Sequence, residues 1–450
     1  MSAAAGSARI GALQLPFPGM GDTGLAAHGG QMRAPRFAAL HVKAYRRYFM
    51  VDLLSMTADN IEHVISYWVI FQVFRSPTLA GFAVISHWMP FLLFSLHAGA
   101  LADRYDCRKL IQISQALFMS ASVAWAILIL TGTLQMWHAA VILIVHGAAG
   151  VLGAPASQLI IHDMVSGEEL PSAIRLNATS RYLAILLGPA IGGGLMLLLG
   201  PAWGLLVNVL IYVPFSVFVR RIPYTGHGGA VSHVHSASLT EIARNVFKDG
   251  LEQRIVMMIA LAGASSFFVG NAFQAQMPEY AEMFDAENTG IRYSILLAAN
   301  ATGAIVGVLL LEGANILRPT VRTAIVCAGF WGLTMGLFPM AKNYQLAVAL
   351  LVMAGVFSIT FTSMAQTLVQ MLAPAAKRGT IVGLFITAML GLRAGSGLTV
   401  GVLGAYIGIR LSLELSSLMV VFTALTLFAF DTRTRRRQSL TTLPFEERST

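Results

Sequence analysis

Charged residues are scarce in this sequence. Asp, Glu, Lys and Arg together make up 11% of its 450 residues, whereas a soluble globular domain carries about 25%. Hydrophobic residues reach 56%, and a soluble fold of this length could not bury so much apolar surface. The composition therefore excludes a soluble protein and predicts an all-α protein that crosses a membrane many times.

Several other features are missing. With only Cys107 and Cys327 present, no disulfide framework is expected. No G-x-x-x-x-G-K-[ST] nucleotide-binding motif is present, which argues against transport driven by ATP. Residues 1–42 lack a basic segment followed by a long apolar run, so we expect a flexible cytoplasmic tail rather than a signal peptide.

Twelve segments are long and apolar enough to span a bilayer as helices, which need about 20 residues. They cover residues 48–73, 79–101, 109–131, 137–161, 173–199, 202–220, 255–279, 290–312, 320–341, 344–371, 379–404 and 411–431. A Gly-, Ser- and His-rich stretch divides them six and six. The predicted organisation is a six-helix bundle (43–220), a cytoplasmic linker (221–253), a second, pseudo-symmetric six-helix bundle (254–431) and a cytoplasmic tail (432–450).

The linker histidines His227, His233 and His235 are irregularly spaced in a flexible, solvated segment. We therefore expect no metal site there, and no cofactor elsewhere.

The basic residues set the orientation. With the N-terminus inside, the inner segments hold 24 of the 30 Lys and Arg residues and the outer loops hold four. Because inner loops of membrane proteins are enriched in Lys and Arg, both termini and the linker are predicted to be cytoplasmic, in a bacterial inner membrane. This topology explains the net charge of +9 better than nucleic-acid binding does.

A dense knot of charge, "GALADRYDCRKL" (99–110), lies between the second and third spans. It resembles the G-x-L-a-D-R-x-x-x-R-K signature of the major facilitator superfamily. The resemblance implies the two-bundle fold of that superfamily and a cytoplasmic gate, in which this loop grips the start of the eleventh span near residues 378–380. The alternative is that the charges only enforce topology. The gate residues are Gly99, Asp103, Arg104, Arg108 and Lys109.

The fifth span contains "LGPAIGGGL", which resembles the G-P-x-x-G-G signature of exporting antiporters. Its residues are Gly188, Pro189, Gly192 and Gly193, and the alternative is ordinary close packing of small residues. The first span and the following turn are similar to the proton-driven exporters that include enterobactin and macrolide efflux proteins. In the fourth span, many drug exporters have an Arg four residues before a Gly. Here Leu143 occupies the Arg position, and His146 lies beside Gly147. The drug-exporter mechanism therefore cannot be assigned to this sequence as a whole.

Asp59, Glu62 and His63 share one helical stripe of the first span. Intramembrane charges are costly and mark transport or proton pathways, so these three residues are the predicted proton-coupling group. The alternative is a static network with Arg181 or Arg393, which are the cations well inside spans. These two arginines are predicted partners of the buried carboxylates, or ligands of an anionic substrate.

Aromatic and amide side chains on the expected cavity face suit a bulky amphiphile. The candidates, each with helix packing as the alternative, are Trp68, Asn271, Gln274, Phe361 and Gln366. The isolated histidines His87, His97 and His162 are expected to be border or packing residues.

These features predict a secondary transporter, not an enzyme. It is expected to be a monomer that exports a medium-sized amphiphile (a siderophore, secondary metabolite or drug) in exchange for protons, by alternating access. The alternatives are a proton symporter that takes up an organic solute, and a membrane sensor built on the same scaffold. The intramembrane carboxylates argue against the sensor, because a passive scaffold has little use for them.

Overall fold

The structure, a computed structural model, describes residues 37–165, 168–227, 252–270, 272–312, 320–374 and 378–441. Its first half consists of the helices α1 (Ala38–His41), α2 (Lys43–Phe74), α3 (Pro77–Arg104), α4 (Cys107–Leu130), α5 (Met136–Met164) and α6 (Leu170–Arg221). Helix α6 contains two spans, which are separated at Gly200. This glycine has φ 78°, a left-handed conformation that suits glycine, so the chain turns where the Gly200-Pro201 pair predicts.

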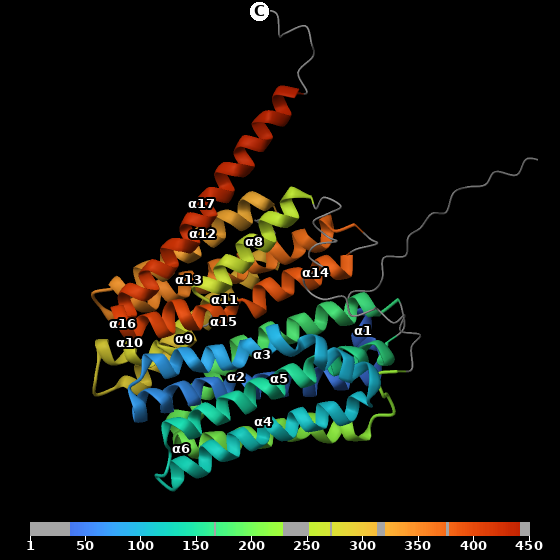
Figure 1. The fold of residues 1–450 in the computed structure, drawn as a ribbon, viewed down its shortest axis with the longest axis vertical. Coiled ribbons are helices and arrows are strands. Elements are labelled where there is room, and N and C mark those ends of the chain that lie inside the picture. The colour runs from blue at the N-terminus through green and yellow to red at the C-terminus, as the bar shows by residue number, and fades with distance from the viewer. Residues whose placement is uncertain are drawn as a thin grey trace, which may run out of the picture. The chain divides into compact units, whose positions relative to one another are not determined.

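The second half is also helical but more broken (Figure 1). It consists of α8 (Gln253–Phe268), α9 (Ala272–Ala275), α10 (Met277–Phe284), α11 (Thr289–Glu312), α12 (Val321–Leu337) with the short η1 (Phe338–Met340), α13 (Tyr344–Leu372), α14 (Arg378–Ile386), η3 (Thr387–Gly391), α15 (Arg393–Ser396), η4 (Gly397–Val402), α16 (Leu403–Ile407) and α17 (Ile409–Thr441). Elements η3 and η4 are π-helical turns.

Within the described ranges, the twelve predicted spans lie mostly on helical residues. Nine helices within the described ranges are long and apolar enough to cross a membrane. Helix α2 is not among them, because the polar stripe that includes Asp59 and Glu62 lowers its hydropathy. The seventh span is interrupted between α8 and α10, and the eleventh contains both π-helical turns.

The helical body extends beyond the predicted bundle boundaries at both ends. Helix α1 lies inside the predicted 1–42 tail, and its Ala39 N–H donates to the Ser172 hydroxyl at 3.3 Å. At the other end, α17 continues past residue 431 to Thr441. There the buried carboxylate of Asp431 accepts from Arg322 and Arg435, each at 2.9 Å, which ties α17 to the start of α12.

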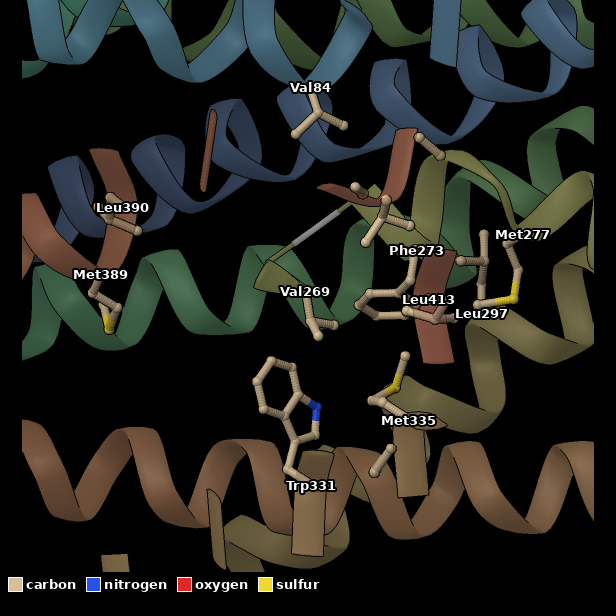
Figure 2. Close-up of a cluster of buried hydrophobic side chains, with 14 of the residues drawn as sticks. Val84, Val269, Phe273, Met277, Leu297, Trp331, Met335, Met389, Leu390 and Leu413 are labelled. Carbon is tan, nitrogen blue, oxygen red and sulfur yellow. The ribbon is translucent and has the colours of Figure 1, made fainter. Parts of the chain in front are cut away.

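Apolar side chains from both halves share one core cluster. Figure 2 shows Val84 of α3 in the same cluster as Val269, Phe273 and Trp331 from the second half. The Tyr293 hydroxyl of α11 donates to the Val64 carbonyl of α2 at 2.9 Å.

The two halves meet where α2 ends and α3 begins. Arg75 forms an ion pair with Glu282 of α10. Close by in sequence, Gly81 of α3 lies backbone to backbone against Gly397 and Gly401 of η4, and a Cβ atom at any of these three glycines would clash with the opposing chain. We call this contact of three glycines the glycine seam.

Candidate transport site

Helix α2 supplies the acidic groups of the site. Its residues Asp59, Glu62 and His63 follow one another on a single turn, and Glu62 is 2% exposed. His63 Nδ1 donates to the Asp59 carbonyl at 2.7 Å, which fixes the ring against its own helix. Because a charged group in lipid is costly, this stripe requires partners from neighbouring helices.

The partner is a histidine of α5. His146 contacts Asp59 Oδ1 through Nε2 at 2.8 Å and Glu62 Oε1 through Nδ1 at 2.9 Å. With both carboxylates ionised, they only accept hydrogen bonds, so both ring nitrogens donate and the imidazole is a cation between two anions. The sequence predicts Arg181 or Arg393 as the partner of these carboxylates. In the structure the imidazole of His146 holds this position, because α5 approaches α2 at the depth of Asp59.

Glu62 has a second anchor on α4. The Ser122 hydroxyl donates to Glu62 Oε2. Behind it, the Asn208 amide of α6 donates to Ser122 at 3.4 Å and to the Ala58 carbonyl at 2.9 Å. Glu62 is therefore hydrogen-bonded deep in the bundle, whereas the Asp59 side chain retains 23% exposure.

Glycines set the helix spacing around this group. A Cβ on Gly147 would clash with the Ser86 carbonyl of α3, so the residue after His146 must lack a side chain. A Cβ on Gly188 would clash with Asn60, and one on Gly192 would lie 3.2 Å from the Ile61 Cα. The span-5 motif thus packs on α2 between Asp59 and Glu62.

The other two members of that motif face elsewhere. Gly193 approaches Ser294 of α11 in the second half, and Pro189 lines the cavity described below.

A third histidine joins the group from α3. His87 is 6% exposed, and its ring centroid lies 4.4 Å from that of His63 and 5.4 Å from that of His146. The sequence predicts a packing role for His87 and marks His146 only as a departure from the drug-exporter pattern. Neither is predicted as a member of the site, although both are buried polar residues of largely apolar helices.

One cavity opens onto this group. Its polar lining includes Asp59, His63, His87, Arg181, Gln274 and Arg393, so both halves contribute. Arg181 of α6 interacts electrostatically with Asp52. Arg393 of α15, between the two π-helical turns, stacks over the Trp88 ring at 5.0 Å. The two predicted buried cations therefore face the same space.

The other predicted cavity residues are placed differently. Phe361 is 4% exposed and stacks on Trp331 at 5.7 Å, so it belongs to the core and the expectation of a cavity residue is wrong. Trp68 stacks on Tyr293 at 5.6 Å, and Tyr293 rather than Trp68 lines the cavity. Gln366 is also not among the described residues lining it. Asn271 lies outside the described residues.

The charge knot is tied to its own bundle. Asp106 accepts from the Arg108 backbone at 3.0 Å and so caps α4. The Arg108 side chain pairs with Asp106 and donates to the Ile222 carbonyl at 3.0 Å. These hydrogen bonds lower the pKa of Asp106. Asp103, Arg104 and Lys109 are exposed.

The gate glycine of the knot is not in close contact in this conformation. A Cβ on Gly99 would meet no atom of the described residues within 4 Å. The side chains of the expected partner, residues 378–380, lie outside the described part of the chain.

Comparison with known proteins agrees with this architecture. The family model of transmembrane secretion effectors matches residues 34–448. The staphyloferrin A transporter of Staphylococcus aureus (strain NCTC 8325 / PS 47) is 26% identical over 187 residues, which cover 39% of this chain and 46% of that transporter. The chain thus matches about half the length of that relative.

Solved transporters share the fold. The nucleoside transporter NupG superimposes with a TM-score of 0.64 at 13% identity over 86% of this chain and 98% of that one. A bacterial homologue of the human lysosomal transporter Spinster gives 0.64 at 13% over 86% and 96%, and the D-xylose–proton symporter gives 0.60 at 16% over 86% and 97%. The chain belongs to the transmembrane secretion effector family and has the major facilitator fold of these solved transporters.

Proposed function

We propose that this protein is a proton-coupled antiporter that exports a medium-sized amphiphilic molecule from a bacterial cell, with a siderophore as the favoured cargo. It works as a monomer in the inner membrane, with both termini in the cytoplasm. The observation that carries the proposal is the chain of Asp59, His146 and Glu62, which borders the cavity.

This chain has the chemistry that coupling requires. An antiporter needs a group that holds a proton in one state and releases it in the other. The imidazole of His146 bridges a carboxylate that reaches the cavity and one buried behind it, at 2.8 and 2.9 Å. A proton that enters from the cavity is accepted by Asp59, and His146 connects that carboxylate to a second acceptor, Glu62, without an apolar gap.

The cavity suits an anionic amphiphile. Arg181 and Arg393 offer guanidinium groups to the cavity, which bind carboxylates well, and Trp88 and Tyr293 add aromatic surface. The siderophore named for the staphylococcal relative supports the same class of cargo.

The contacts between the halves support an inward-facing state. The Arg75–Glu282 ion pair and the glycine seam close the end that the Lys and Arg distribution assigns to the outside. The charge knot lies at the opposite end and is the gate that would close there.

The test is proton movement in proteoliposomes with an imposed pH gradient. Iron-free staphyloferrin A is the first probe and a macrolide the second. We expect Asp59→Asn to bind the transported probe with near wild-type affinity but to lose coupled exchange by at least tenfold. Glu62→Gln is expected to be milder, since Glu62 does not reach the open cavity.

The matched control is Glu287→Gln, which removes an exposed carboxylate and leaves exchange unchanged. Wild-type coupled exchange in Asp59→Asn would place the proton site elsewhere. A probe that accumulates with the proton gradient rather than against it would identify a symporter and overturn the export proposal.

A further inference from the structure

We propose that Asp59, His63, His87 and His146 form a binding site for a divalent transition-metal ion such as Zn²⁺. The four residues come from three helices, α2, α3 and α5, and each offers one ligand atom. These atoms all lie within 4.8 Å of one another. The site goes beyond the proposed transport function and does not depend on it.

The ring positions fit a shared ion. With a metal–nitrogen distance of about 2.0–2.1 Å and tetrahedral angles, the centroids of two ligating imidazoles lie about 5 Å apart. The three pairs among His63, His87 and His146 are separated by 4.4, 4.9 and 5.4 Å.

The surrounding groups orient two of the rings as they do in metal sites. A metal-bound histidine almost always donates its other ring N–H to a carboxylate or a carbonyl. His146 does this through Nδ1 to Glu62, at 2.9 Å, and His63 through Nδ1 to the Asp59 carbonyl, at 2.7 Å. In both cases Nε2 is the remaining ligand atom, and on His146 the ion replaces the proton shared with Asp59.

His87 provides the independent observation. Its side chain is more than nine-tenths buried, and its Nδ1 has no hydrogen-bond partner among the described residues. A buried polar atom without a partner is uncommon and costs stability. A metal ion in the centre of the group supplies a partner for His87.

The charge of the group and its access from the cavity also fit a divalent metal ion. Asp59 and Glu62 together neutralise a divalent cation, and three imidazoles with one carboxylate form a donor set that suits zinc and its neighbours rather than magnesium or calcium. Asp59, His63 and His87 line the cavity, which gives an ion a route to the site.

The binding test uses the full-length protein in detergent micelles, stripped with a chelator and titrated with Zn²⁺ in a calorimeter. We expect one tight site per chain, and a loss of affinity of at least tenfold in His87→Gln and in Glu62→Gln. His97→Gln, on the exposed face of the same helix as His87, is the matched control and should bind like wild type.

A variant with His227, His233 and His235 all replaced by Ser excludes the linker as the source of binding. The visible spectrum of the Co²⁺-loaded wild type, with the bands of a four-coordinate site, reports the same geometry without any substitution in the site. A wild type that binds no Zn²⁺, or binding that survives His87→Gln and disappears in the linker variant, would overturn the proposal.

The two proposals fail separately. If Asp59→Asn keeps coupled exchange while the wild type binds Zn²⁺, the coupling proposal fails and the metal site stands. If exchange is lost in Asp59→Asn while the wild type binds no Zn²⁺, the metal-site proposal fails and the coupling proposal stands.

Discussion

At the scale of single residues, the charge of the site depends on His146. The ring and Glu62 are buried together, with side-chain exposures of 5% for His146 and 3% for Glu62, whereas Asp59 retains 23%. Removing one partner of a buried charge group leaves the others uncompensated, which typically costs about 3–5 kcal/mol. The ring therefore serves the stability of the bundle as well as any proton or metal chemistry.

We accordingly expect His146→Gln to lower the thermal stability of the purified protein strongly. Adding Asp59→Asn and Glu62→Gln to this variant should restore much of the loss, because no unpaired charge then remains. Thermal unfolding in detergent measures both. His162→Gln, on the exposed side of the same helix, is the control, and equal stability of the single and triple variants would show that the charges are compensated from elsewhere.

The sequence allowed three of the five residues of this group to be predicted. The stripe of Asp59, Glu62 and His63 follows from helical spacing alone. His87 and His146 carry no pattern of their own, but their depth was available: each lies ten residues after the start of its helix, and His63 lies eleven residues before the end of α2. At 1.5 Å per residue, all three stand at one level, about 15 Å from the same helix ends.

At the scale of helices, the spacing of α3 and α5 depends on a missing side chain. Gly147 lies on the Ser86 carbonyl, and this contact brings His146 and His87 together. We expect Gly147→Ala to push α5 away from α3, with an overpacking cost of about 1–3 kcal/mol and a loss of transport.

Gly194→Ala is the matched control, because a Cβ there meets no atom within 4 Å. Expression level, thermal stability and Zn²⁺ binding measure the difference between the two variants. If Gly147→Ala is as stable and as active as Gly194→Ala, the helices have room that the structure does not show.

Helix positions were easier to predict than helix irregularities. Long apolar runs predicted helix ranges that the described residues largely follow, because lipid enforces helices of a minimum length. The break between α8 and α10 and the π-helical turns around Arg393 left no signal in hydropathy. Phe361 illustrates the same limit, since its contact with Trp331 on another helix decides that it is core and not cavity.

At the scale of the whole molecule, the charge knot is expected to act in the state opposite to this one. Asp103 is exposed here, whereas a carboxylate docked on a helix N-terminus is worth about 0.3–2 kcal/mol in the state where the contact forms. We expect Asp103→Asn to reduce transport while leaving expression near wild type.

Asp106→Asn in the same loop is the contrasting variant. Its carboxylate caps α4 in the present state, so it should lower thermal stability more than it shifts the balance of conformations. Cysteine accessibility on both sides of the membrane reports that balance. If Asp103→Asn changes neither the balance of conformations nor transport, the charges of the knot only set the membrane topology and do not act as a gate.

A substitution in the glycine seam is expected to destabilise one conformational state of the molecule and not the other. A side chain added at Gly401 has no room while Gly81 lies against it, yet meets no such obstacle once the halves separate there. A penalty of 1–3 kcal/mol on one state shifts the populations about 5- to 150-fold. Gly401→Leu should therefore favour the conformer in which the halves have separated at this end, and inhibitors or antibodies raised against this variant would recognise the face that the seam covers.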